Sequence, residues 1–295
     1  MIEGRTYEQG TQSRIQSEKA AVNFSKLIND LWYDKGIETL LFRNQLIDKR
    51  TSEILNLHNY ARKVVGKTIN IEDTLSVVEA MNRMDLCPAR LDIGKLASEW
   101  IEEADHFSSV DSFLTAKLRD HIGADNRKEV VPRDVVLYGF GRIGRLAARE
   151  LIAMEGKGEQ LRLRAIVTRD GSKETIEKRA SLLRVDSVHG PFPGTVEPDE
   201  ENDALIVNGR TIHLITAKGP EEIDYTAYGI NNALIIDNTG AFRDDVALAR
   251  HLTAKGAAKV LLTAPGKGVP NIVHGVNQLN FDPENVDIFS AASCT

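Results

Sequence analysis

The chain has 295 residues, of which 42% are apolar and 27% charged, a mixture typical of a folded protein of about two domains. Its net charge of −6 argues against nucleic acid or an anionic membrane as the main partner, because an acidic protein repels polyanions. No apolar run approaches the roughly 20 residues of a membrane-spanning helix. The N-terminus lacks the apolar core of a secretory signal, and two cysteines form no disulfide framework. We therefore expect a cytoplasmic protein.

Residues 1–130 are predicted to be an all-α region. Apolar residues recur at helical spacing between residues 13 and 65, and Gly36 and Gly66 are helix-stop candidates. Polar residues that can cap three further helices follow: Asn70, Asp92 and Ser109. This region has no metal-ligand spacing, phosphate loop or nucleophile motif. We interpret it as a helical extension that packs on its neighbour or on another subunit.

A polar stretch, residues 123–129, is predicted to be a linker, and beyond it the pattern changes. Short runs rich in Val and Ile alternate with helical patterns, which predicts strand–helix–strand units and a mostly parallel sheet. The predicted strands are 135–138, 163–167, 233–236, 259–263 and 286–289. We therefore expect an α/β, Rossmann-like domain over residues 131–295.

A glycine-rich turn, Gly139-Phe140-Gly141-Arg142-Ile143-Gly144, follows the first predicted strand and opens a predicted helix. In that context the spacing indicates a dinucleotide site. Gly139 permits the tight turn, Gly141 lets the backbone approach a pyrophosphate, and Gly144 lets helix and strand pack closely. The helix N-terminus then binds the anion.

The end of the second predicted strand leaves the choice of cofactor open. A carboxylate about 20 residues after the glycine turn normally binds the adenosine ribose, but here Thr168 and Arg169 precede Asp170. Asp170 can reach the ribose hydroxyls, which favours NAD. Alternatively, Thr168 and Arg169 can accept a 2′-phosphate, which allows NADP, because an arginine makes a charge-assisted bond to phosphate.

Several further stretches occur in a recognisable order. They are Asp186-Ser187-Val188-His189-Gly190, a hairpin at Asn208-Gly209, Asn238-Thr239-Gly240-Ala241-Phe242, Thr263-Ala264-Pro265-Gly266-Lys267, Gly275-Val276-Asn277 and Ala292-Ser293-Cys294-Thr295. With the glycine turn, they make the chain from Gly139 onward resemble the phosphorylating glyceraldehyde-3-phosphate dehydrogenase family. The extension before them lies outside the usual pattern and resembles that of longer bacterial members.

The resemblance implies a site as well as a fold. It implies that the backbone N–H groups of Arg142 and Ile143 contact the pyrophosphate and that Lys218 is a basic cofactor contact. It places Thr239, Gly240 and Thr263 on the nicotinamide side. It also implies that Cys294 is the nucleophile, flanked by the substrate-binding residues Ser293 and Thr295.

The implied reaction is the oxidative phosphorylation of glyceraldehyde 3-phosphate in glycolysis or gluconeogenesis, with inorganic phosphate as second substrate and NAD or NADP as cofactor. A thiol suits it, because a thiolate attacks the aldehyde and its thioester stays reactive toward phosphate. A free thiol has a pKa of about 8.5, so the site must lower it with a histidine or a helix N-terminus. The resemblance also implies a homotetramer.

The chain departs from the family after the nucleophile motif. Nothing follows Thr295, and every histidine precedes Cys294, so the family's activating histidine has no counterpart. We therefore expect an N-terminal part of a longer enzyme, without the catalytic domain and inactive alone. Two alternatives remain: a relative acting on another phosphorylated aldehyde, such as erythrose 4-phosphate, and a non-catalytic dinucleotide-binding module.

Overall fold

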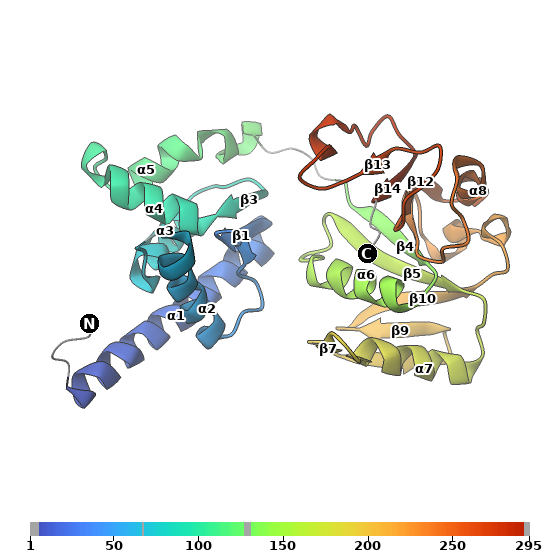
Figure 1. The fold of residues 1–295 in the computed structure, drawn as a ribbon, viewed down its shortest axis with the longest axis horizontal. Helices are drawn as coiled ribbons and strands as arrows, with labels where there is room; N and C mark the ends of the chain where they lie inside the picture. The colour runs from blue at the N-terminus through green and yellow to red at the C-terminus, as the bar shows by residue number, and fades with distance from the viewer. Residues whose placement is uncertain (1–5, 67, 127–130, 292–295) are drawn as a thin grey trace. The chain divides into compact units, whose positions relative to one another are not determined.

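The computed structural model describes residues 6–66, 68–126 and 131–291 (Figure 1). The chain forms two compact units, unit 1 over Met1–Glu129 and unit 2 over Val130–Thr295. Ser293, Cys294 and Thr295, the implied nucleophile motif, lie outside the described residues. Across the described ranges, no helix combines the length and apolar character needed to cross a membrane.

Unit 1 is mainly helical, as predicted. Its longest helix, α1 (Tyr7–Lys35), ends at Gly36, whose φ of 67° is the left-handed conformation that glycine adopts at helix ends. The other helical elements are α2 (Thr51–Tyr60), the π-helical turn η1 (Ala61–Val65), α3 (Ile71–Arg83), α4 (Ile93–Glu103), η2 (Ala104–His106), α5 (Val110–Lys117), η3 (Arg119–His121) and η4 (Ala124–Asn126). The predicted caps are confirmed, because the Asn70, Asp92 and Ser109 side chains each accept a backbone N–H from the following helix.

Unit 1 also contains a small sheet that the predicted all-α region did not include. Its strands are β1 (Ile37–Leu41), β2 (Asn44–Gln45) and β3 (Ala89–Asp92), in the order β2-β1-β3. Alternate residues of β1 are buried, which is a strand pattern, but five residues between helices are too few to stand out. The parallel partner β3 lies far away along the chain. Only the tertiary fold brings the two strands together.

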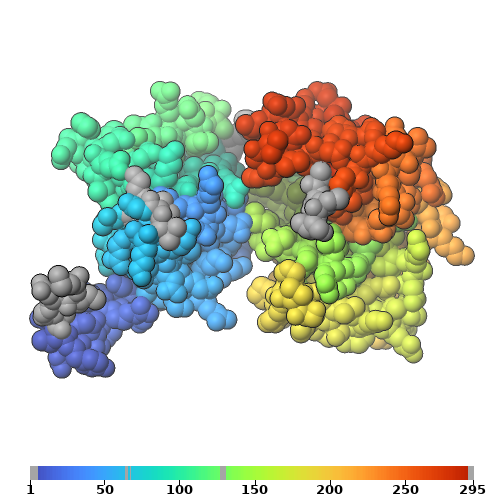
Figure 2. Space-filling view, in the orientation of Figure 1, coloured from blue at the N-terminus to red at the C-terminus, as the bar shows by residue number. Residues whose placement is uncertain are grey.

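The core of unit 1 lies where α1 packs on α3. Phe24, Ile28 and Leu31 of α1 are buried in one apolar cluster with Val77 and Met81 of α3. The first turns of α1 extend beyond this core, as the dark blue helix end in Figure 2 shows. Burial of these apolar side chains, rather than helix propensity alone, therefore stabilises the second half of α1.

Unit 2 alternates strands and helices from residue 133 onward. Its strands are β4 (Arg133–Tyr138), β5 (Leu161–Thr168), β6 (Val185–Asp186), β7 (Gly190–Pro191), β8 (Val196–Asp199), β9 (Ala204–Val207), β10 (Arg210–Thr216), β11 (Ala233–Asp237), β12 (Ala257–Leu262), β13 (Asn271–Ile272) and β14 (Ile288–Ala291). Its helical elements are α6 (Arg142–Ala153), α7 (Lys173–Arg184), η5 (Pro220–Glu222), η6 (Tyr225–Tyr228), α8 (Asp245–Ala249), η7 (Arg250–Thr253) and η8 (Gln278–Asn280). The five predicted strands correspond to β4, β5, β11, β12 and β14.

The nine-stranded sheet has the order β13-β14-β12-β11-β4-β5-β10-β9-β8. Its strands from β13 to β10 are parallel, whereas β10, β9 and β8 form an antiparallel edge. The predicted hairpin joins β9 to β10 through Asn208 and Gly209, both with positive φ. The parallel sheet and its helices confirm the predicted Rossmann-like class.

The sheet is buried on both faces, which suits parallel strands. Val135 and Leu137 of β4 face one apolar cluster, which includes residues of α6 and α7, and Val136 and Tyr138 face the other. The chain continues from β4 to β5 on one side, and β11 later pairs with β4 on the other. The carboxyl end of β4 is thus a point where strand order reverses, where α/β sheets commonly bind ligands.

Candidate cofactor site

The turn after β4 depends on Gly139. Its φ is 96°, in the region that favours glycine, and its N–H donates to the Val167 carbonyl of β5 at 2.9 Å. A Cβ atom here would lie 2.8 Å from Cγ2 of Thr239. Glycine therefore lets three strand ends, those of β4, β5 and β11, meet closely.

Gly144 lets α6 approach this turn. A Cβ atom on Gly144 would lie 2.3 Å from the Gly139 carbonyl oxygen, which no side chain can tolerate without a shift of the backbone. Gly141 differs, because a Cβ atom there would meet nothing within 4 Å. Open space at Gly141 and close packing at Gly144 match the two roles expected from the glycine spacing.

The N-terminus of α6 offers an anion site. Gly141 is the N-cap residue, no side chain caps the helix, and its first turn contains no acidic residue. The first N–H groups of a helix have no intrahelical partner, and the helix dipole favours negative charge there. Arg142 and Ile143 supply such N–H groups beside the open space. The residues present therefore fit the pyrophosphate of a dinucleotide.

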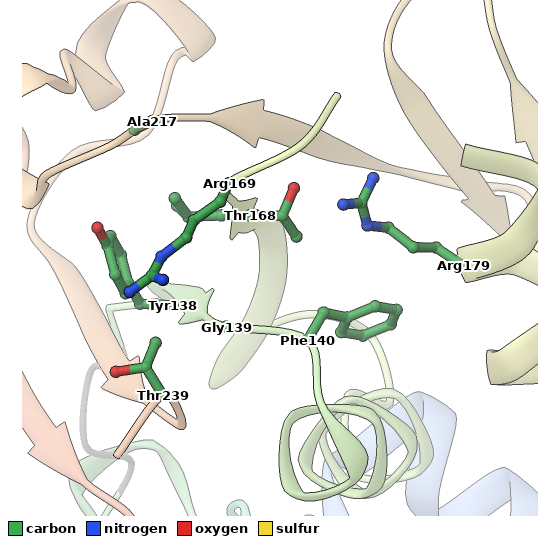
Figure 3. Close-up of a pocket in the computed structure, with 9 residues that line it drawn as sticks. Tyr138, Gly139, Phe140, Thr168, Arg169, Arg179, Ala217 and Thr239 are labelled. Carbon is green, nitrogen blue, oxygen red and sulfur yellow. The ribbon is translucent and has the colours of Figure 1, made fainter. Parts of the chain in front are cut away.

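A cavity of about 380 Å³ opens at the same strand ends (Figure 3). It is lined by Tyr138, Gly139, Phe140, Val167, Thr168, Arg169, Arg179, Ala217 and Thr239. Four of the predicted cofactor residues thus meet in one cavity: Gly139, Thr168, Arg169 and Thr239. They come from the ends of β4, β5 and β11, which the parallel sheet places at one edge.

The other predicted residues lie around this cavity rather than in its lining. Asp170 is exposed, and its carboxylate accepts the Ser172 N–H at 3.0 Å, at the start of α7. Lys218 is exposed and directly follows the lining residue Ala217. Gly240 has a positive φ of 69° in the loop after β11. Thr263 donates through both N–H and Oγ1 to the Asp237 carbonyl, at 3.1 and 3.0 Å.

Arg179 is the lining residue that sequence reasoning missed. It lies on α7, outside every motif, and its guanidinium reaches in toward Thr168, whereas Arg169 extends toward Tyr138 (Figure 3). Its sequence signal is only a cation on a half-buried helix, which by itself indicates no site. Packing of α7 against the sheet decides that it enters the cavity.

A buried pair holds the loop that carries Thr239. One carboxylate oxygen of Asp237, Oδ1, accepts the Thr239 N–H and hydroxyl, both at 2.8 Å. The other, Oδ2, lies 2.9 Å from Nε2 of His251. Because Asp237 is fully buried, its hydrogen bonds hold Thr239 in position at the cavity.

Comparisons with known proteins identify the family to which this part of the chain is similar. The family model described as glyceraldehyde 3-phosphate dehydrogenase, NAD binding domain, matches residues 133–245, which include the glycine turn, α7 and the Thr239 loop. The matched residues of unit 2 belong to this NAD-binding domain family. The description of the family names NAD as the cofactor.

Individual relatives carry the same family name. The chain is 44% identical over 272 residues to the glyceraldehyde-3-phosphate dehydrogenase-like protein of Pseudomonas aeruginosa, covering 91% of this chain and 59% of that protein. It is 35% identical over 193 residues to glyceraldehyde-3-phosphate dehydrogenase A, chloroplastic, of Zea mays, covering 65% of the chain and 45% of the relative. For the glyceraldehyde-3-phosphate dehydrogenase of Thermotoga maritima the identity is 40% over 162 residues, covering 55% and 45%.

The lengths of these matches differ in whether they include unit 1. A match of 272 residues is longer than unit 2, so similarity to the Pseudomonas protein must extend well into unit 1. The Thermotoga match is no longer than unit 2 itself. The chain spans about half the length of the curated relatives that it matches.

Proposed function

We propose that this protein takes part in the NAD-dependent oxidation and phosphorylation of glyceraldehyde 3-phosphate. The observation that carries the proposal is the cavity at the ends of β4, β5 and β11, beside the uncapped N-terminus of α6. A dinucleotide needs an anion site at a helix N-terminus and a ribose site at the end of the second strand, and both elements lie at this edge. The names of the relatives support the choice of aldehyde.

In this proposal the described residues bind and orient the cofactor. The N–H groups of Arg142 and Ile143 hold the pyrophosphate, and Thr239 lines the nicotinamide side together with Gly240 and Thr263. Lys218, next to the cavity, adds positive charge. When bound, NAD supplies the hydride acceptor for the aldehyde carbon. Fixed backbone donors suit this role because they need no reorganisation on binding.

The chemical step is proposed for Cys294. Its thiolate attacks the aldehyde carbon, and after loss of hydride the carbon is held as a thioester on the sulfur. Inorganic phosphate then attacks the thioester, which releases the acyl phosphate and restores the thiolate. Ser293 and Thr295 are proposed to contact the substrate. A homotetramer and a place in sugar-phosphate metabolism belong to the same proposal.

Calorimetric titration of the chain with NAD tests the binding role. We expect a single site, lost in Gly141→Val, where a side chain would fill the open space beside α6. Absence of NAD binding by the chain would contradict the proposal.

The reaction itself is tested on the native protein, by NADH formation from glyceraldehyde 3-phosphate and phosphate. Cys294→Ser should abolish the activity while NAD binding persists. Erythrose 4-phosphate as the better substrate would favour the related enzyme, and NAD binding without either activity would favour a non-catalytic module. The 295-residue chain by itself is expected to be inactive in this assay.

A further inference from the structure

Arg179 has a buried hydrogen-bond donor that points to a missing acceptor. One guanidinium nitrogen, Nη2, donates to the Asp170 carbonyl. The other, Nη1, is buried, yet it has no hydrogen-bond partner within the described part of the chain. Burial lowers the pKa of this guanidinium, because its charge is poorly solvated. Buried donors are normally satisfied, so an anion at this place would complete the site.

The cavity in front of Arg179 is suited to an anion. The two charged residues among those lining it are both arginines, Arg169 and Arg179, and Thr168 lies between them in Figure 3. The described residues give Arg169 neither a hydrogen-bond acceptor nor an ion-pair partner for its guanidinium. Two arginines that line one cavity, neither of them in an ion pair with a carboxylate among the described residues, favour a bound phosphate.

The nearest carboxylate is engaged elsewhere. Asp170 Oδ1 accepts the Ser172 N–H at 3.0 Å, and its side chain is not part of the cavity lining. Hydrogen bonds from Ser172, together with the nearby charge of Arg179, hold the pKa of Asp170 below its usual value, so the carboxylate stays ionised. A carboxylate that lined the ribose site would repel a 2′-phosphate, and Asp170 does not line this cavity.

This cavity lies at the end of β5, where a dinucleotide-binding sheet meets the adenosine ribose. We propose that Arg179, with Thr168 and Arg169, forms a subsite for the 2′-phosphate of NADP, so that the protein binds NADP as well as NAD. The inference rests on the proposed dinucleotide binding and names the residue that sets cofactor selectivity. Arg179 is a binding residue in this proposal and touches no reacting atom.

Calorimetric titration of the chain with NADP, NAD, adenosine 2′,5′-bisphosphate and adenosine 3′,5′-bisphosphate tests the subsite. Arg179→Met should weaken binding of NADP and of the 2′,5′-bisphosphate by about tenfold or more, the effect of one lost charged hydrogen bond. Binding of NAD and of the 3′,5′-bisphosphate should change by less than about twofold. Arg179→Lys should be intermediate, because lysine keeps the charge but not the planar fork.

Lys178→Met is the matched control. Lys178 is the neighbouring residue on α7, is exposed and does not line the cavity, so its loss removes the same charge without touching the subsite. NADP binding that responds equally to both variants would overturn the inference and indicate general electrostatics. NAD binding without NADP binding would also overturn it. If neither dinucleotide binds, the proposed function fails, and the subsite fails with it unless the 2′,5′-bisphosphate binds in an Arg179-dependent way.

Discussion

Asp237 and His251 form a hydrogen-bonded pair, with Oδ2 and Nε2 2.9 Å apart and both side chains fully buried. The imidazole packs against two aromatic rings, Tyr138 at 4.6 Å and Phe242 at 4.9 Å between ring centroids. Because Asp237 also bonds Thr239, the pair links the segment after α8 to the cavity. A single buried interaction thus supports both the sheet edge and the cofactor site.

Replacing His251 by Leu should destabilise unit 2. The substitution keeps apolar bulk but leaves Asp237 Oδ2 buried without a partner, at a cost of about 3 kcal/mol. We expect a lower free energy of unfolding in urea, followed by far-ultraviolet circular dichroism, and weaker NAD binding because Thr239 loses its support. Lys255→Met is the control, since Lys255 belongs to an exposed pair with Asp224 whose loss should cost under about 0.5 kcal/mol. Equal effects of the two variants would refute the buried-pair argument.

Gly144→Ala should mainly reduce stability, whereas Gly141→Ala should mainly reduce NAD affinity. The first places a Cβ atom 2.3 Å from the Gly139 carbonyl, so α6 must shift, at a cost of about 1–3 kcal/mol of stability. The second places a methyl group in open space at an N-cap, with a cost below about 1 kcal/mol, but where the pyrophosphate is expected. Gly141→Ala should therefore reduce NAD affinity more than stability. Unchanged NAD affinity in Gly141→Ala would argue against the assigned pyrophosphate position.

The stability of unit 2 should depend on pH through the carboxylate of Asp186. The N–H and side chain of His189 and the N–H of Val188 all bond its Oδ1 and hold its pKa well below the usual range. Because the pKa of Asp186 is lower in the folded than in the unfolded protein, its ionised carboxylate stabilises the fold at pH values above the unfolded pKa of about 3.9. This stabilisation is lost as the pH falls toward the pKa of the folded state. Asp186→Asn should therefore be less stable than the wild type at neutral pH, with a gap that narrows below about pH 4.

Urea denaturation at several pH values between neutral and acid measures this gap. Asp120→Asn is the control, because its carboxylate is 83% exposed and contacts only the side chain of its neighbour Arg119 among the described residues. The control should be as stable as the wild type throughout. A gap that widened on acidification would have the wrong sign for a depressed pKa.

Lys35 should contribute more to the stability of unit 1 than the exposed Lys26 of the same helix. Its Nζ donates to the carbonyls of Met81, Asn82 and Met84 at the end of α3, at 3.3, 2.7 and 2.5 Å. Lys35→Met leaves these carbonyls without that donor and should cost about 2 kcal/mol. Lys26→Met, which breaks an exposed pair with Asp30 on the same helix, should cost under about 0.5 kcal/mol. Tryptophan fluorescence measures both, because Trp32 and Trp100 lie in unit 1.

Local patterns in the sequence predicted much of this fold. The alternation of apolar runs and helical stretches after residue 130 predicted the parallel sheet, because buried parallel strands need continuous apolar runs. Gly139, Gly141 and Gly144 predicted the turn, because their requirements depend on backbone geometry within six residues. The caps at Asn70, Asp92 and Ser109 were predictable for the same reason.

The sequence by itself therefore determined the class of unit 2, the position of the cofactor turn, the end of α1 and the starts of α3, α4 and α5. The tertiary structure decided which side chains share the cavity: it directed Arg179 inward, turned Asp170 toward α7, joined Asp237 to His251 and paired β1 with β3. The physical reason is that backbone patterns are local, whereas the direction of a side chain is set by how distant elements pack against one another.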